Sequence, residues 1–152
     1  MRNIIALPIT PALFAPFGIL LSTDGLRAEH RHNAPQSQTY IETLWAPAQS
    51  GHCDIQRMER HGFSTQTFFP LDVSRYLVVV CPGGDGDRPD TARALAFVVD
   101  GRMALQYHRG TWHCNMAALD RPGLFANLVQ KNHGEDDCTV ITVPPFRVTL
   151  PS

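Results

Sequence analysis

Short apolar segments closed by turn residues recur along the whole chain, and almost none of them has the spacing of a helix. The clearest are residues 76–81, a β-branched run typical of a buried strand, and residues 95–99. About ten short strands joined by turns predict an all-β sandwich or barrel. The expected strands are residues 4–9, 19–21, 53–61, 64–70, 76–81, 95–99, 103–107, 116–119, 125–129 and 138–143.

Three local signals add detail to this prediction. Thr10 followed by Pro11 predicts one short N-terminal helical turn, with Thr10 as its cap and proline at its first position. Asp100-Gly101, between the segments 95–99 and 103–107, predicts a β-hairpin. Pro144-Pro145 should stop the last strand, since proline cannot donate a ladder hydrogen bond.

The stretch from Thr23 to Ser50 loses periodicity and gains polar, proline and histidine residues. We expect a long irregular loop at about 23–50, with residues 39–45 as a short ordered piece. Such a loop is either a lid or binding element or plain surface chain. With 152 residues and 43% apolar content, one domain over residues 1–152 has enough material for a core.

Composition narrows the partners and the compartment. The net charge is −1 and the Lys and Arg residues are scattered, so we expect no nucleic-acid partner. Prolines at positions 8, 11 and 16 interrupt the apolar N-terminal stretch, which argues against a signal peptide or a membrane span. The four cysteines are widely spaced and form no Cys-x-x-Cys pair, which favours free thiols in a cytoplasmic protein.

Titratable side chains are concentrated in Tyr107-His108-Arg109-Gly110-Thr111-Trp112-His113, directly after the predicted strand 103–107. A strand that alternates sides and then turns at Gly110 would aim several of these groups into one concave space. The alternative is a polar strand end whose Tyr and Trp merely cap a core, because clustered titratable residues are only a probabilistic sign of a site.

A second candidate wall comes from the strand 53–61. Its alternation places Ile55, Arg57, Glu59 and His61 on one side and Arg60 on the other. In the next predicted strand Gln66 and Phe68 share a face. Glu59, His61 and Gln66 therefore join the candidate site, although a satisfied core histidine and an exposed Glu59–Arg60 ion pair are the plainer interpretations.

These motifs, taken in order, resemble the ureidoglycolate lyase family of the cupin superfamily. The resemblance rests on Met58-Glu59-Arg60-His61, the following Thr-Gln-Thr-Phe-Phe-Pro at 65–70, the 107–113 heptad and Asp137-Cys138. It implies a cupin-like jelly-roll β-barrel, a cytoplasmic homodimer, and cleavage of ureidoglycolate to glyoxylate and urea in the allantoin branch of purine degradation. It also raises a divalent metal such as nickel as a candidate cofactor.

Departures from the family pattern mark the chain as a divergent member. Gly62 stands where the family has proline after the histidine, and Cys114 where it has a second histidine after Trp-His. Met103-Ala104-Leu105-Gln106 replaces a more polar element. The alternatives are therefore a cupin lyase, isomerase or hydrolase acting on another small carboxylic acid, and a non-catalytic cupin that binds a small metabolite.

Elimination of urea from ureidoglycolate needs a base for the hydroxyl proton, an acid for the leaving nitrogen and a cationic anchor for the carboxylate. Histidine suits both proton transfers, and arginine offers a planar fork for a carboxylate. The predicted catalytic residues are His108, His113 and Tyr107, and the predicted substrate-binding residues are Arg109, Gln66, Glu59 and His61. His61, His108 and His113 are the metal candidates, although the last two are five residues apart rather than in the usual cupin His-x-His spacing.

Overall fold

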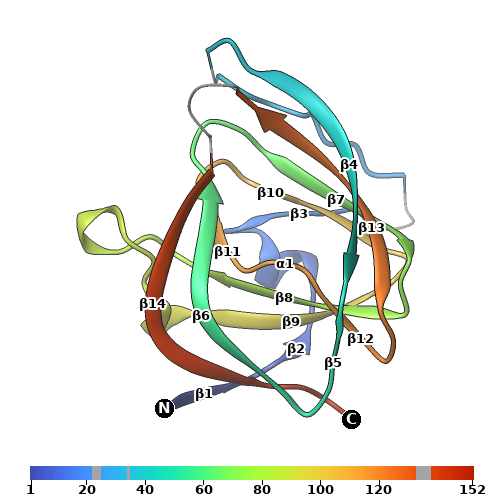
Figure 1. The fold of residues 1–152 in the computed structure, drawn as a ribbon, viewed down its shortest axis with the longest axis vertical. Helices are drawn as coiled ribbons and strands as arrows, with labels where there is room; N and C mark the ends of the chain where they lie inside the picture. Colours follow the sequence, from blue (N-terminus) through green and yellow to red (C-terminus); the bar gives the residue numbers. More distant parts are fainter. Residues whose placement is uncertain (22–24, 34, 133–137) are drawn as a thin grey trace.

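The computed structural model describes residues 1–21, 25–33, 35–132 and 138–152 (Figure 1). Thr23, at the start of the predicted loop, and Asp137, part of the resemblance, lie outside the described residues. Within the described part the chain forms fourteen β-strands, the helix α1 (Pro11–Phe14) and two 3-10 turns at Asp85–Asp87 and Thr91–Arg93. The predicted all-β class with one short helix is confirmed.

Two sheets face each other and nearly close into a cupin-like barrel (Figure 1). The larger runs in the order β1 (Arg2–Ile5), β14 (Cys138–Thr149), β6 (His52–His61), β11 (Trp112–His113), β8 (Arg75–Cys81), β12 (Ala117–Leu119) and β5 (Ala48–Gln49), with β9 (Leu95–Asp100) on β8 and β2 (Leu7–Pro8) on β9. The smaller runs β3 (Gly18–Leu21), β10 (Ala104–Tyr107), β7 (Gln66–Asp72), β13 (Gly123–Lys131) and β4 (Gln38–Ala46).

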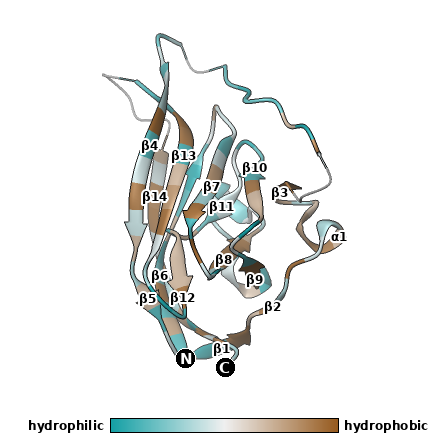
Figure 2. Ribbon diagram, turned by 90° about the vertical axis from the view of Figure 1, so that its right-hand side faces the viewer, coloured by the Kyte–Doolittle hydropathy of each residue, from teal (hydrophilic) through white to brown (hydrophobic). Residues whose placement is uncertain are grey.

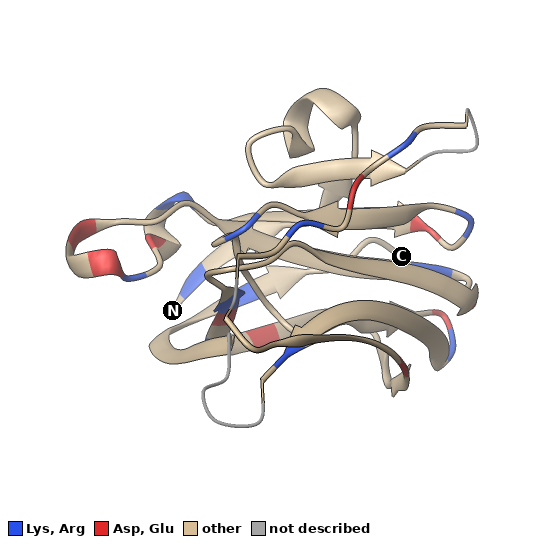
Figure 3. Cartoon of the chain, turned by 90° about the horizontal axis from the view of Figure 1, so that it is seen from above, with Lys and Arg blue, Asp and Glu red and all other residues tan. Residues whose placement is uncertain are grey.

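Strand β8 is buried on both faces, which is why it reads as a continuous apolar run. Tyr76, Val78 and Val80 belong to one core cluster, and Leu77 and Val79 to a second cluster on the other face. Most other strands are mixed, and Figure 2 shows brown and teal segments along β4, β7 and β13. Charged residues of both signs are spread over strands and loops (Figure 3).

The N-terminal helix forms as its sequence predicts. The Thr10 hydroxyl accepts a hydrogen bond from the Leu13 amide at 3.2 Å, and Pro11 opens the helix. The helix inserts Phe14, which is fully buried, beside Tyr107 and Phe97. It is followed by β3, which pairs with β10 and so lies beside the strand that ends in Tyr107.

The predicted hairpin at Asp100-Gly101 is wrong. Strand β9 pairs with β8 and β2, whereas β10 pairs with β3 and β7 in the other sheet. Gly101 lies against residues 73–74, where its amide donates to the Ser74 carbonyl at 2.9 Å and an added Cβ would meet the Val73 oxygen. The tight turn therefore carries the chain from one sheet to the other, a choice made by tertiary packing.

Two further expectations fail at one β-bulge. Strand β14 continues to Thr149 through Pro144-Pro145, because the pairing with β6 shifts between Thr142 and Phe146 and needs no proline amide there. The shift also alters the alternation of β6, where Ile55 lies in the same apolar cluster as Met58. Ile55 is therefore not on the side of Glu59 and His61.

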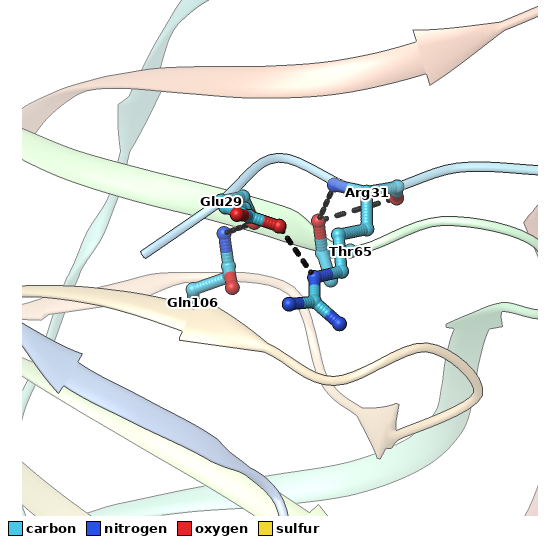
Figure 4. Close-up of polar contacts among 4 residues, drawn as sticks. All are labelled: Glu29, Arg31, Thr65 and Gln106. Carbon is cyan, nitrogen blue, oxygen red and sulfur yellow. Dashed lines mark hydrogen bonds and ion pairs between the residues drawn. The ribbon is translucent and has the colours of Figure 1, made fainter. Parts of the chain in front are cut away.

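The predicted loop at 23–50 is largely structured. Residues 38–46 form β4 and residues 48–49 form β5, so the ordered piece expected at 39–45 is confirmed and longer. The segment 25–33 is hydrogen-bonded to the barrel rim (Figure 4): Gln106 Nε2 donates to the Glu29 carbonyl at 2.9 Å, and the Arg31 amide donates to Thr65 Oγ1 at 3.0 Å. Among the described residues, the helices are all too short to cross a bilayer.

Candidate active site

A carboxylate and an imidazole meet inside the barrel. Pairing of β11 with β6 places His113 directly opposite Glu59, with 3.5 Å between His113 Nε2 and Glu59 Oε1. His113 Nδ1 lies 2.9 Å from the Thr111 carbonyl oxygen. Because a carbonyl can only accept, Nδ1 carries a hydrogen, and Nε2 is the nitrogen that faces Glu59. His113 is 1% exposed, so its imidazole is shielded from bulk water.

The pKa of Glu59 is lowered despite its partial burial. Desolvation alone would raise it, but the hydrogen bond and charge of His113, the Cys138 thiol 3.5 Å from Oε2, and His61 together outweigh that cost. Glu59 is therefore a carboxylate at neutral pH, ready to accept a proton or to hold one on His113.

Two aromatic rings flank His113. The Tyr107 ring stacks on it with 4.1 Å between centroids, and the His61 ring lies nearly parallel at 6.0 Å. Tyr107 is 1% exposed, and its hydroxyl has no hydrogen-bond partner within the part of the chain that the structure describes. Burial is the main reason why the pKa of Tyr107 lies well above its usual range, so the phenol stays protonated and can donate.

Three adjoining pockets meet at Glu59. The first, of about 170 Å³, is lined by His113 and Arg57, and the second, of about 270 Å³, by His61 and Gln130. The third, of about 320 Å³, is lined by Asn115. Gln66 and Asn127 line the two larger pockets and are joined by a hydrogen bond from Gln66 Nε2 to Asn127 Oδ1 at 3.3 Å. The side-chain oxygen of Gln66, Oε1, is buried and has no hydrogen-bond partner among the described residues, so it can accept a hydrogen bond from a ligand amide.

Cationic groups differ in their availability to this cavity. Lys131 borders it, but its ammonium is 2.6 Å from a Glu42 carboxylate oxygen. Arg57 lines the same pocket as Glu59 and His113 and has no ion pair within the described ranges. The β6 alternation puts Arg57 on the face of Glu59, which makes its guanidinium the candidate anchor for a ligand carboxylate.

The turn at Gly110 divides the predicted heptad. Gly110 has a positive φ of 74°, and its amide donates to the His61 carbonyl at 2.8 Å. Tyr107 and His113 lie inside the barrel with Glu59, His61 and Gln66, whereas His108 and Arg109 are exposed and line a separate outer groove. His108 Nε2 lies 3.0 Å from the Ala15 carbonyl oxygen. The structure therefore unites five of the seven predicted site residues.

The three predicted metal ligands are not united. His108 lies in the outer groove, away from His61 and His113. Across the described ranges, no three His, Cys, Asp or Glu side chains gather closely enough to hold a metal ion. The donor set does not fit the expected metal site, and the chemistry below uses the side chains alone.

Asn127 was not among the predicted site residues. It faces inward on β13 between Phe125 and Val129, which are buried on the same side of the strand. An amide in an apolar alternation is the sequence signal that could have identified it. Gln130, also buried, is bonded through its oxygen to Thr39 and His30 and through its nitrogen to Ser37, so it closes the rim.

Fold and cavity define a cupin-like barrel protein with a half-buried carboxylate against a buried imidazole, and with amide groups suited to a small polar ligand. The ureidoglycolate lyase family matches residues 26–149, and the chain belongs to that family. It is 31% identical over 168 residues to the ureidoglycolate lyase of Azotobacter vinelandii, covering 95% of this chain and all of the relative. It is 34% identical over 150 residues to that of Pseudomonas savastanoi, covering 89% and 86% of the two chains.

Proposed function

We propose that this protein is a lyase that cleaves ureidoglycolate to glyoxylate and urea. The observation that supports it best is the pair of the half-buried Glu59 and the buried His113, beside the amides of Gln66 and Asn127 inside the barrel. The relatives named ureidoglycolate lyase, which span most of the chain, support the same substrate.

The reaction breaks the bond between the carbinol carbon and the ureido nitrogen. The hydroxyl of the carbinol loses its proton, its oxygen forms the aldehyde carbonyl of glyoxylate, and the bonding pair leaves with the nitrogen, which takes up a proton to give urea. A base and an acid must therefore face one carbon, at positions that bulk water does not reach.

In this proposal the Glu59 carboxylate accepts the hydroxyl proton, and His113, protonated on both ring nitrogens, delivers the proton on Nε2 to the leaving nitrogen. The Thr111 carbonyl accepts from Nδ1–H, so the hydrogen on Nδ1 stays in place and Nε2 is the nitrogen that gives up its proton. Proton return from Glu59 to His113 across 3.5 Å then restores the starting state. The His61 ring lies nearly parallel to that of His113, and its charge helps to keep the pKa of Glu59 low.

Substrate orientation is assigned to four side chains. The Arg57 guanidinium binds the substrate carboxylate, while Gln66 and Asn127 bind the ureido group. The Tyr107 hydroxyl donates to the developing carbonyl oxygen, which supplies the partner it lacks in the free protein. His108 and Arg109, the other predicted residues, take no part in this scheme because they line the outer groove.

Glyoxylate release, coupled to a dehydrogenase, tests the assignment. His113→Ala and Glu59→Gln should each lower kcat by roughly 10²–10⁴-fold, the usual contribution of general acid or base catalysis. His108→Ala is the matched control and should retain kcat within about threefold, because its imidazole lies in the outer groove beside the Ala15 carbonyl.

Loss of activity in His108→Ala with retention in His113→Ala would move the site to the outer groove. Absence of glyoxylate release by the wild-type protein would remove ureidoglycolate as the substrate and leave the alternatives of another small carboxylic acid or simple metabolite binding.

We further propose a cytoplasmic homodimer. Strand β4 is a sheet edge, and its Ile41 and Trp45 are 77% and 63% exposed, which suits burial against a second copy. The four cysteines are thiols, as a reducing compartment requires. Light scattering during size-exclusion chromatography should give twice the chain mass for the wild type, and Ile41→Lys should shift it toward the monomer.

A further inference from the structure

A second cavity lies outside the barrel, where the helix end, the β8 end and the Gly110 turn meet. It has a volume of about 720 Å³, within the usual range for small-molecule pockets, and shares no lining residue with the three pockets around Glu59. The mechanism proposed above does not use it. Its lining includes His108 and Arg109, which the sequence singles out and the barrel site leaves aside.

This outer groove is cationic. Arg2, Arg93 and Arg109 line it together with His108, and none of the described residues that line it is an Asp or Glu. Arg93 and Arg109 form no ion pair within the described part of the chain, and Arg2 donates to the Thr91 carbonyl. By contrast, the arginines at 31, 60, 75, 102, 121 and 147 all pair with carboxylates. Like charges gathered without a partner favour an anionic ligand.

The rest of the lining is apolar. Leu13 and Leu95 are 46% and 39% exposed, and Phe17 is buried beneath them. Two guanidinium groups from different segments can each bind one anionic group as a planar fork: Arg93 ends the 3-10 turn, and Arg109 lies in the Gly110 turn. The chemistry fits a small ligand with two negative charges and an apolar body.

The turn of residues 108–111 lies between the outer groove and the barrel site. The His108 amide donates to the Phe17 carbonyl at 2.9 Å, and the Gly110 amide donates to the His61 carbonyl at 2.8 Å. Thr111 also lines the groove, and its carbonyl accepts the hydrogen bond that orients His113. A ligand bound to Arg109 would therefore lie on the peptide segment that bonds the His61 backbone and the His113 imidazole.

We propose that the outer groove is a separate binding site for a small dianion, of the dicarboxylate or phosphate type, held by Arg93 and Arg109 over the apolar floor. Its occupancy is transmitted to His113 through the 108–111 turn. The binding step stands apart from the proposed lyase reaction, because it involves neither Glu59 nor ureidoglycolate.

Calorimetric titration at low ionic strength tests the site with phthalate and inorganic phosphate as dianions and benzoate as the monoanion. Phthalate should bind at least about fivefold tighter than benzoate, since it can engage both arginines. Arg93→Ala and Arg109→Ala should each weaken phthalate binding by about fivefold or more, and raising the salt concentration should weaken it further. Arg88→Ala, an exposed arginine outside the groove, is the matched control and should leave affinity within about twofold.

Amide chemical shifts of the ¹⁵N-labelled wild-type protein locate the ligand without any variant. Phthalate should move Gly110, Thr111 and His113, and leave Asn127 unmoved. No binding of either dianion at about ten millimolar, equal weakening by Arg88→Ala, or shifts centred on Asn127 would overturn the proposal. The last result would mean that the anion enters the barrel site instead. A protein inactive on ureidoglycolate would still give the predicted shifts, so the two proposals fail independently.

Discussion

Removing the side-chain hydroxyl should change the free energy of unfolding in opposite directions at two buried tyrosines, Tyr76 and Tyr107. Tyr76 is fully buried and its hydroxyl donates to the Met103 carbonyl at 2.6 Å, whereas the buried Tyr107 hydroxyl has no partner among the described residues. Tyr→Phe removes one oxygen atom from each site and leaves the ring packing in place. The comparison therefore isolates the hydrogen bond from the burial of the ring.

The magnitudes follow from the two environments. Tyr76→Phe loses a buried hydrogen bond and should lower the free energy of unfolding by about 1–2 kcal/mol. Tyr107→Phe removes an unsatisfied buried hydroxyl, whose burial costs about 1–3 kcal/mol, and should raise the free energy of unfolding by about 1 kcal/mol. Each kcal/mol corresponds to about 2–4 °C in Tm for a chain of this size. The two variants should thus differ by about 2–3 kcal/mol, or roughly 4–12 °C.

Urea unfolding followed by fluorescence, with m-values checked for agreement, gives both free energies. Kinetic assays complete the comparison: Tyr107→Phe should lower kcat while raising stability, because its hydroxyl is reserved for the substrate, and Tyr76→Phe should leave kcat within about threefold. Destabilisation of Tyr107→Phe by more than about 1 kcal/mol would refute the reasoning, since it would mean that the hydroxyl is already satisfied in the free protein.

Three other results follow from the structure. Because the pKa of Glu59 is lowered in the folded state, its contribution to stability is present above the ordinary carboxyl pKa of about 4.3 and is lost as the pH falls through the lower folded value. Unfolding measured against pH should therefore show a smaller loss of stability in acid for Glu59→Gln than for the wild type. Gly18→Ala should destabilise the protein by at least about 2 kcal/mol in urea, since its Cβ would lie 2.0 Å from the Gln106 carbonyl oxygen; a change within about 0.5 kcal/mol would contradict this. Elemental analysis of the purified wild type and His108→Ala should give equal metal contents, since His108 does not join His61 and His113; stoichiometric nickel lost in His108→Ala would restore the predicted ligand set.

Local signals in the sequence predict much of this protein. The Thr10–Pro11 cap, the β-branched run in β8 and the turn at Gly110 act over a few residues, and each forms as its side chains dictate. The alternation of β6 between Arg57 and His61 likewise places Glu59 and His61 on one face. For these elements the chain's nearest neighbours carry the information.

Other features depend on partners that are distant in sequence. Asp100-Gly101 has the composition of a hairpin turn, yet contacts with residues 73–74 send β9 and β10 into different sheets. The bulge opposite β6 turns Ile55 to the other face and lets Pro144-Pro145 lie within a strand. Each outcome is set by a packing surface that local propensity does not describe.

The sequence by itself determined an all-β barrel with the short capped helix, and gathered the acid–base residues into two short motifs. Only the tertiary structure decided which members of those motifs meet. Strand pairing brought His113 against Glu59, and the Gly110 turn sent His108 and Arg109 to the outer surface. The physical reason is that side-chain identity and spacing act within a strand, whereas cross-strand register and turn direction are fixed by packing between strands far apart in the chain.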